Sequence, residues 1–443
     1  MRFTANRSVP ALLISLFVLV TAALFTTPGV SAARSPRKAA LAGEQPTPTQ
    51  PTPSACPNRE LPPAPVDTSE EPQPGGARPE PLPVPEDPVG GTRMGECGLI
   101  YPTGADEPPA NITAASWVIS DLDSGAVLAA KDPHARERPA SLIKVLLAIV
   151  AIRELRQDMV VVGTAEDANQ EGTRVGIGLG GEYTVRQLLF ALIMHSGNDA
   201  AHALARSVGG VPTALNKMNS LAKELGALDT RTATPSGLDG PGMTTSAYDQ
   251  SVIFRAAMKH REFAEAAATR QIDFPGYGGK PGFKVNNDNK LLSQYRGFLG
   301  GKTGFTDDAR HTYLGAAARG EHRLTVVLLR GERVASAPLS DQGSKLLDYG
   351  FALAEKGNRP VGQLVDKSPE AQPNGDVSSG DNSAGAPNNN APGPAEATLD
   401  TGRSAFGNVG LPLVALAGVA MLMSVALWWR RRRARAARQA AQP

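Results

Sequence analysis

The central part of the chain, residues 110–356, has a regular pattern of apolar and polar positions between two long polar stretches. The segments 115–121 and 126–131 are short apolar runs separated by Asp123-Ser-Gly125, which predicts a β-hairpin. The residues that follow Ser141 are apolar on every face of a helix, apart from Lys144, so this helix should be buried. The pattern up to about residue 268 is mainly helical.

Three further apolar runs, 297–303, 312–318 and 324–330, predict strands, and 339–355 predicts a final helix. Strands at both ends with helices between them favour one antiparallel sheet that is built from both ends and carries a helical insertion. The expected class is therefore α/β in the broad sense, or α+β.

The first 32 residues predict a secretory signal peptide. Arg2 and Arg7 precede an apolar run at 11–25, and Val30-Ser31-Ala32 has the small-x-small pattern of a cleavage site. An uncleaved N-terminal anchor is the alternative.

An uncharged apolar segment at 409–429 is long enough to cross a bilayer, and the basic residues 430–443 would remain on the cytoplasmic side. We therefore expect a single-pass type I protein of the cell membrane, with the domain outside. Because the arginines directly follow the apolar segment, a nucleic-acid site is disfavoured. Of the formal net charge of +2, the tail contributes six arginines and the signal peptide two, which leaves −6 elsewhere and indicates no anionic polymer as partner.

Residues 33–109 hold about half of the 37 prolines, and residues 357–408 are again polar and rich in Pro, Gly and Asn. Such composition predicts an extended, mobile N-terminal segment and a disordered spacer. The only two cysteines, Cys56 and Cys97, lie in the first of these segments. For an exported protein a disulfide between them is expected, with two free thiols as the alternative.

Ser141 and Lys144 are spaced i, i+3, which places both side chains on one face of the predicted helix. Burial lowers the pKa of a lysine, and a neutral lysine can take the proton of a serine nucleophile. The N-terminal end of the helix would also favour negative charge developing at Ser141. The alternative is a helix cap followed by a lysine that extends to solvent.

Two other motifs follow at separations of roughly 55 and then 106 residues: Ser196-Gly-Asn198 and Lys302-Thr303-Gly304. The first lies in a break between the helical patterns 185–195 and 199–208, and alone it would be an ordinary helix cap. The second ends a predicted strand, and alone it would be a simple turn. In this order, the three motifs resemble those of penicillin-binding proteins and class A β-lactamases.

Two more segments, Gly237-Leu-Asp-Gly240 and Asn289-Lys-Leu-Leu292, are similar to segments of low-molecular-weight D-alanyl-D-alanine carboxypeptidases. The resemblance covers about residues 115–349. It implies a β-lactamase/transpeptidase-like fold, an antiparallel five-stranded sheet flanked by helices with a helical subdomain. It also implies a serine carboxypeptidase that removes the terminal D-Ala from peptidoglycan stem pentapeptides through an acyl-enzyme, that penicillins inhibit, and that needs no cofactor or metal.

The resemblance also implies roles for individual residues. Ser141 would be the nucleophile and Lys144 its base, Ser196 would pass a proton to the leaving group, Asn198 would hold Lys144 and the substrate carbonyl, and Lys302 would add positive potential beside Ser196.

Four residues at the end of the third motif would bind the substrate. Thr303 and Thr306 would contact its carboxylate, and Gly304 would let the backbone approach closely. The backbone N–H groups of Phe305 and Ser141 would form the oxyanion hole.

The chain departs from the family pattern at two positions. Asp288 stands where some relatives have an arginine for the substrate carboxylate, which leaves the preference between a terminal D-Ala-D-Ala and a cross-linked peptide open. Arg310 stands where a small residue is common, and the sequence indicates no role for it.

Three alternatives are weaker. A class A β-lactamase needs a glutamate for deacylation, and Glu224 is the only glutamate between Asn198 and Met258. A zinc peptidase is disfavoured because the histidines lack metal-binding spacing, although His195 and His202 would share a helix face. A non-catalytic wall-binding protein of the same fold is disfavoured by the intact motifs.

Overall fold

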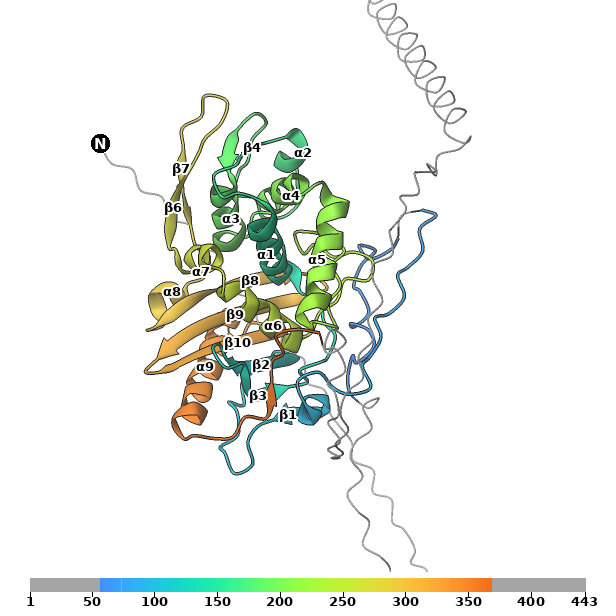
Figure 1. Cartoon of the computed structure of the whole chain (residues 1–443), viewed down its shortest axis with the longest axis vertical. Helices are drawn as coiled ribbons and strands as arrows, with labels where there is room; N and C mark the ends of the chain where they lie inside the picture. The colour runs from blue at the N-terminus through green and yellow to red at the C-terminus, as the bar shows by residue number, and fades with distance from the viewer. Residues whose placement is uncertain (1–55, 73, 336, 369–443) are drawn as a thin grey trace, which may run out of the picture. The chain divides into compact units, whose positions relative to one another are not determined.

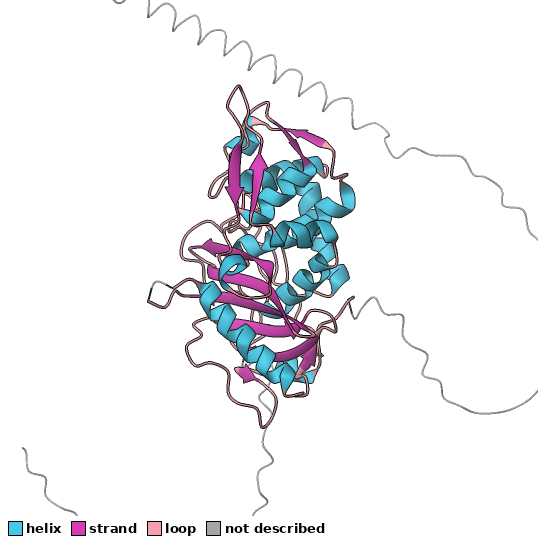
Figure 2. Cartoon of the chain, turned by 90° about the vertical axis from the view of Figure 1, so that its left-hand side faces the viewer, coloured by secondary structure: helices cyan, strands magenta, loops and turns pink. Residues whose placement is uncertain are grey.

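A computed structural model describes residues 56–72, 74–335 and 337–368. These residues form an antiparallel sheet with helices on both faces and a mostly helical part beyond the sheet edge formed by β8 (Figures 1 and 2). The mixed fold that the sequence predicts is therefore confirmed.

The sheet has the strand order β1-β3-β2-β10-β9-β8, with β11 paired to β3, and each pairing is antiparallel. Five long strands form the predicted sheet, and two strands of two residues extend it. The long strands are β2 (Ser116–Asp121), β3 (Ala126–Lys131), β8 (Phe298–Thr306), β9 (Arg310–Arg319) and β10 (His322–Gly331), and the short ones are β1 (Leu99–Ile100) and β11 (Gly362–Gln363).

Helices cover both faces of the sheet, which explains why its strands are almost continuously apolar. Helix α9 (Leu339–Glu355) packs on one face, and α6 (Ala247–Met258) packs on the other. Along β2, Trp117 and Ile119 join the core beneath α9, whereas Val118 joins the core that the remaining helices share. Alternate residues of one strand thus enter two separate cores.

The helical part surrounds the buried helix α1 (Lys144–Glu154), whose first eight residues are buried. Around it lie α3 (Val185–Met194), α4 (Asn198–Ser207), α5 (Val211–Leu225) and α7 (Arg261–Ala268). The smaller elements are the helices α2 (Ala165–Ala168) and α8 (Leu291–Gln294), the 3₁₀ turns η2 (Thr92–Gly95) and η3 (Ala140–Ile143), and two sheets of two strands each, β4 (Val160–Val162) with β5 (Glu182–Thr184) and β6 (Gln271–Phe274) with β7 (Phe283–Asn286).

The predicted strands and the final helix agree with the structure to within a few residues, and three local features differ. Ser141 lies in η3, and the α-helix itself begins at Lys144. The Lys302-Thr303-Gly304 motif lies inside β8, which continues to Thr306. The two small sheets were missed because their strands have only three or four residues, most of them at least partly exposed.

Residues in 56–72 and 74–109 contact the central domain, whereas their composition predicts a mobile segment. This proline-rich segment is mostly extended, but its backbone carbonyls accept hydrogen bonds from buried side chains of the central domain. Arg136 donates to the carbonyls of Glu60, Leu82 and Pro83, with distances of 2.7, 2.7 and 2.8 Å. The segment therefore folds onto the domain through polar contacts, although it lacks the apolar residues to fold alone.

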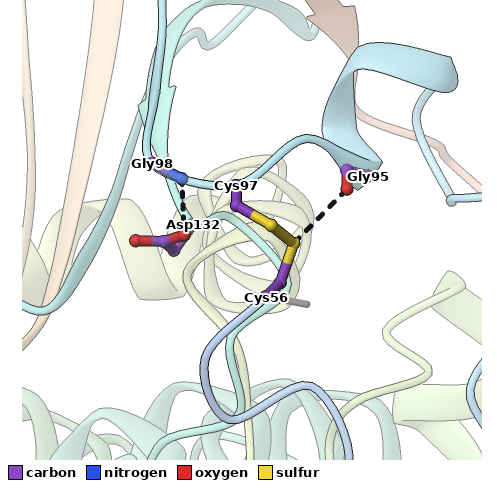
Figure 3. Close-up of a disulfide and its surroundings, with 5 residues drawn as sticks. All are labelled: Cys56, Gly95, Cys97, Gly98 and Asp132. Atoms are coloured by element: carbon purple, nitrogen blue, oxygen red, sulfur yellow. Dashed lines mark hydrogen bonds between the residues drawn. A yellow bond between two sulfur atoms is a disulfide. The ribbon is translucent and has the colours of Figure 1, made fainter. Parts of the chain in front are cut away.

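A disulfide joins Cys56 and Cys97, the pairing that the sequence analysis predicts (Figure 3). The residue after Cys97 is held as well, because the Gly98 N–H donates to the Asp132 carboxylate at 2.7 Å. Asp132 directly follows β3, so the disulfide lies beside the sheet.

At the other end, the polar segment expected from residue 357 onward begins later. The backbone returns to the sheet as β11, and the flanking residues Val361 and Leu364 are buried. The remainder of the predicted spacer, the signal peptide at 1–32 and the basic tail at 430–443 lie outside the described residues.

The predicted cell-membrane location is not supported and is corrected here. Among the helices that the structure describes, none is both long and apolar enough to cross a membrane. The segment for which the single span was predicted, 409–429, lies outside the described residues.

Glu137 provides a test of the fold through pH-dependent stability. Its carboxyl group is buried, accepts a hydrogen bond from Asn58 Nδ2 at 3.2 Å and lies 4.0 Å from Arg330. Burial raises the pKa of Glu137 from 4.5 to about 7, because the charged form loses its hydration. The protonated form therefore stabilises the fold at low pH, and this contribution is lost as the pH rises through 7.

We expect Glu137→Gln to remove this loss. Between pH 4 and pH 8, the free energy of unfolding of the variant minus that of the wild type should rise by about 3 kcal/mol. Urea unfolding at several pH values measures this difference. A constant difference across that range would contradict the buried, neutral carboxyl.

Candidate active site

Ser141 is held over the sheet by the short turn η3. Its neighbour Ala140 has a φ of +46°, a conformation that L-residues adopt only where their surroundings enforce it. Thr312 of β9 donates to the carbonyl of Pro139 at 3.0 Å. A side chain at Gly237 would lie 2.0 Å from the Ala140 oxygen, so a glycine is required there. These contacts fix the backbone on which Ser141 lies.

Lys144 points into the protein, where its Nζ lies 2.8 Å from Ser141 Oγ and 2.7 Å from Asn198 Oδ1. It also contacts the carbonyl oxygen of Ser236. Burial lowers the pKa of Lys144 well below its ordinary value, and the positive charge of Lys302 lowers it further. A neutral amine has two N–H donors for the amide and carbonyl oxygens, and its lone pair is then free to accept the Ser141 proton.

Ser196 and Asn198 lie in the tight connection between α3 and α4. Ser196 has a φ of +62°, and the Asn198 side-chain amide donates to the Glu171 carbonyl at 2.6 Å. The neighbouring Asp199 accepts hydrogen bonds from the backbone N–H groups of residues 175, 176 and 177 at 2.8 to 3.0 Å. The loop at 171–177 is thereby fixed against the motif and holds the Asn198 amide toward Lys144.

Lys302 reaches Ser196 from β8. Its Nζ lies 2.8 Å from Ser196 Oγ and 2.7 Å from the Thr303 carbonyl oxygen, and its side chain is buried. Burial lowers the pKa of Lys302 to about 7, while the nearby carboxylate of Asp288 acts in the opposite direction. The site thus contains two buried amines, one on each serine of the motifs.

Gly304 allows β8 to pass directly beside Ser141. A Cβ atom there would lie 2.4 Å from Thr312 Oγ1 and 2.8 Å from the backbone nitrogen of Ser141. The glycine is therefore needed for contact between protein segments, whereas the sequence suggested an approach to a ligand. It lets the next residue, Phe305, lie close to Ser141 in the site.

A cavity of about 410 Å³ opens onto these groups. Among its lining residues are Ser141, Ser196, Thr303, Gly304 and Phe305 from the predicted site, together with Thr173, Asp288, Asn289, His311, Thr312, Tyr313, Arg333 and Ser340. Lys144, Asn198 and Lys302 lie behind this surface and reach it through the two serines. Eight of the nine predicted residues therefore form one site. Five line the cavity, Lys144 and Lys302 contact its two serines, and Asn198 contacts Lys144. Gly304, one of the five, also lies against the backbone of Ser141.

Thr306 is the predicted residue that the structure does not bring to the cavity. Its hydroxyl accepts a hydrogen bond from the Ala309 N–H at 2.9 Å, in the turn after β8. Arg310 follows this turn, where it pairs with Glu332 at 2.7 Å and lies 5.9 Å from the ring of Phe305. Arg310 thus lies near Phe305, which lines the cavity.

The role of Ser236, whose carbonyl is the third oxygen around Lys144, was not predicted from the sequence. The signal was present, since Ser236 directly precedes the Gly237 segment that resembles the carboxypeptidases. A backbone carbonyl is present at every residue, however, so the sequence does not reveal which one accepts a hydrogen bond. The motif therefore indicated this segment of the chain but not its contact with Lys144.

The residues named for the alternative functions lie elsewhere. Glu224 is on α5, where it pairs with Arg153 at 3.2 Å and does not line the cavity. His195 and His202 do not share a helix, because α3 ends before His195 and His202 lies within α4. His195 pairs with Asp288 at 3.2 Å beside the cavity, and its pKa is raised by that hydrogen bond.

Comparison with known proteins agrees with this geometry. The sequence model of peptidase family S11, D-alanyl-D-alanine carboxypeptidase, matches residues 103–332, more than half of the chain. D-alanyl-D-alanine carboxypeptidase DacB2 of Mycobacterium tuberculosis is 46% identical over 243 residues, which cover 54% of this chain and 83% of that protein. DacD of Salmonella typhimurium is 35% identical over 260 residues, which cover 56% of this chain and 64% of that protein.

Solved structures have the same fold. A D-alanyl-D-alanine carboxypeptidase from Mycobacterium tuberculosis superposes with a TM-score of 0.57 at 44% identity, covering 60% of this chain and all of that one (100%). A point mutant of the Streptomyces K15 DD-transpeptidase has a TM-score of 0.52 at 26% identity, covering 55% of this chain and 100% of that one.

The fold and the paired serine–lysine contacts define a serine hydrolase of the penicillin-binding class. Within that class, the chain belongs to the D-alanyl-D-alanine carboxypeptidase family.

The pKa of Lys302 leads to a test in the pH profile. Because that pKa is lowered to about 7, the positive charge beside Ser196 is lost as the pH rises through this value. We expect the second-order rate constant for reaction with a penicillin to fall above about pH 7, since a neutral Lys302 no longer attracts the drug carboxylate.

Lys302→Arg is the matched variant, because arginine stays protonated. The maximal rate constant of the variant can differ from that of the wild type. When each pH profile is normalised to its own maximum, the profile of the variant should not fall above about pH 7. Stopped-flow fluorescence with a labelled penicillin measures both profiles. An identical fall in the wild type and the variant would assign the titration to another group.

Proposed function

We propose that this chain removes the terminal D-Ala from peptidoglycan stem pentapeptides through an acyl-enzyme at Ser141. The observation that carries the proposal is the buried contact of Lys144 Nζ with Ser141 Oγ, Asn198 Oδ1 and the Ser236 carbonyl. Family membership supports the substrate class. The contact supplies what a serine nucleophile requires, a neutral base at hydrogen-bond distance.

Acylation begins when Ser141 Oγ attacks the carbonyl carbon of the penultimate D-Ala and transfers its proton to Lys144. The carbonyl oxygen becomes negatively charged between the backbone N–H groups of Ser141 and Phe305. One such donor contributes roughly 3 kcal/mol to stabilisation of the transition state. The C–N bond then breaks, and the leaving amine takes a proton from Ser196, whose hydroxyl Lys302 holds. The proton that Lys144 received from Ser141 replaces it, so that Ser196 is again a hydroxyl and Lys144 a neutral amine.

Water completes the cycle. It attacks the acyl carbon and gives a proton to Lys144. The ester C–O bond then breaks, and this proton passes to Ser141 Oγ, which releases the shortened peptide and restores the Ser141 hydroxyl. Glu224, the glutamate weighed for a β-lactamase, lies away from the cavity and cannot activate this water. A penicillin acylates Ser141 in the same way, but its amine remains tethered to the acyl group, and we expect the adduct to persist.

Binding of the substrate carboxylate falls to Thr303 and Lys302. Thr303 lines the cavity, and Lys302 lies behind it with its amine on Ser196. Asp288 also lines the cavity, where some relatives have an arginine, and its carboxylate pairs with His195. We infer that Thr303 carries most of the direct contact with the terminal carboxylate, since Thr306, at the end of β8, does not line the cavity.

The proposal is tested by the intact mass of the purified protein after addition of a penicillin. The wild type should gain the mass of one drug molecule, and Ser141→Ala should gain none. Lys144→Met keeps the side-chain length and removes the base, so acylation should slow by roughly 100- to 10,000-fold. Lys217→Ala, at an exposed lysine paired with Glu154, is the control and should react like the wild type.

Release of D-Ala from a synthetic pentapeptide should follow the same order of variants. Rapid drug hydrolysis without an accumulating adduct would instead indicate a β-lactamase. Neither adduct nor hydrolysis in the wild type would indicate a non-catalytic binding protein.

A further inference from the structure

The loop that leads from β3 to the nucleophile, residues 132–140, is buried throughout and yet highly polar. We call it the nucleophile loop. Charged groups are rarely buried without partners, because the lost hydration must be replaced by hydrogen bonds or opposite charges. The loop contains Asp132, His134, Arg136, Glu137 and Arg138, each less than one-tenth exposed.

Most of these side chains find partners in the arm, which we define as residues 56–72 and 74–102. His134 Nε2 lies 2.9 Å from the Val89 carbonyl, and Asn58 donates to Glu137. Three arm carbonyls accept hydrogen bonds from Arg136, and an arm N–H donates to Asp132. From Asp132 to Arg138, the loop is therefore lined on one side by the arm.

Arg138 is the contact nearest to the nucleophile, three residues before Ser141. Its guanidinium donates to the Pro63 carbonyl at 2.8 Å and to the Glu70 carboxylate, both in the arm. Glu70 is itself almost buried, at 9% exposure, which removes the solvent screening that weakens surface ion pairs.

The arm also reaches the other wall of the site. Asp308, in the turn after β8, accepts hydrogen bonds from the Val66 N–H at 2.5 Å and from Ser69 Oγ at 3.4 Å. Asp308 lies 4.0 Å from Arg138. One stretch of the arm thus joins the nucleophile loop to the end of the strand that carries Lys302 and Phe305.

The arm is closed on itself by the disulfide between Cys56 and Cys97, whose sequence separation is 41 (Figure 3). The family match begins only at residue 103, so the arm lies outside the matched region. The nucleophile loop lies inside it. A segment outside the family match therefore supplies partners to a loop of the shared catalytic domain.

We propose that the arm is a positioning element for catalysis, and that Glu70, acting through Arg138, holds Ser141 in register with Phe305. This inference rests on the proposed acylation of Ser141. Without the Glu70 carboxylate, Arg138 is a buried cation that has lost its closest anionic partner, and the loop relaxes toward solvent. The Ser141 backbone N–H then shifts relative to that of Phe305, and an error of about 1 Å in such geometry costs roughly 100-fold in rate.

The test compares Glu70→Gln with Glu71→Gln in the full chain. Glu71 is the adjacent, exposed glutamate, so the two variants carry the same chemical change at neighbouring positions. Stopped-flow reaction with a fluorescent penicillin separates the acylation rate constant from the dissociation constant of the non-covalent complex. Glu70→Gln should lower the rate constant roughly 10- to 100-fold and change the dissociation constant less than about two-fold. Glu71→Gln should match the wild type, and Glu70→Asp should recover part of the rate.

A second pair of measurements keeps the proposal falsifiable. Hydrogen exchange at the backbone amides of residues 138 and 140–144 should be faster in Glu70→Gln and unchanged in Glu71→Gln, and this readout does not depend on the acylation reaction. Cys56→Ser/Cys97→Ser, confirmed as folded by its melting curve, should lose acylation rate in the same direction. If that variant does not fold, the Glu70 series, in which the disulfide is intact, decides.

The outcomes separate the two proposals. If the wild type and Glu71→Gln are not acylated at all, the proposed function fails. If both are acylated, and Glu70→Gln has the acylation rate constant and the hydrogen-exchange rates of the wild type, then the arm does not position Ser141 and this inference is overturned.

Discussion

The burial of one lysine amine is the constraint on which the rest of the site depends. Lys144 is surrounded by oxygen acceptors from three segments: its own turn at Ser141, the α3–α4 connection at Asn198, and the loop at Ser236. Were any of these segments to move away, water would enter and the amine would be protonated. The sheet and the helical part must therefore be closed against each other before Ser141 has a base.

A second buried lysine divides the electrostatic tasks. Lys302 lies close enough to Lys144 for its charge to lower the pKa of that amine, so a positive charge on one favours the neutral form of the other. A carboxylate acts in the opposite direction on each amine, because Asp199 raises the pKa of Lys144 and Asp288 raises that of Lys302. Burial nevertheless lowers the pKa of both lysines.

The proline-rich arm shows how a segment without a core of its own can still be ordered. The arm contributes mainly backbone carbonyl groups. An extended, proline-rich segment leaves these carbonyls without backbone partners, and the several N–H donors of an arginine can bind them. Arg136 uses three such carbonyls and also pairs with Asp229 on its inner side at 3.1 Å. A prediction from composition gives a mobile segment here because it considers only how much apolar surface the segment can bury. It does not include the polar partners that another part of the chain supplies.

The sequence by itself determined the three catalytic motifs, the strands and final helix of the sheet, and the pairing of Cys56 with Cys97. These features follow from local periodicity, from residue types in a fixed order, or from there being only two cysteines. Tertiary structure alone decided that Ser236 completes the Lys144 site, that Thr306 lies outside the cavity, and that the arm covers the nucleophile loop. Each of these depends on backbone groups or on contacts between distant segments, and neither leaves a periodic or compositional pattern in the chain.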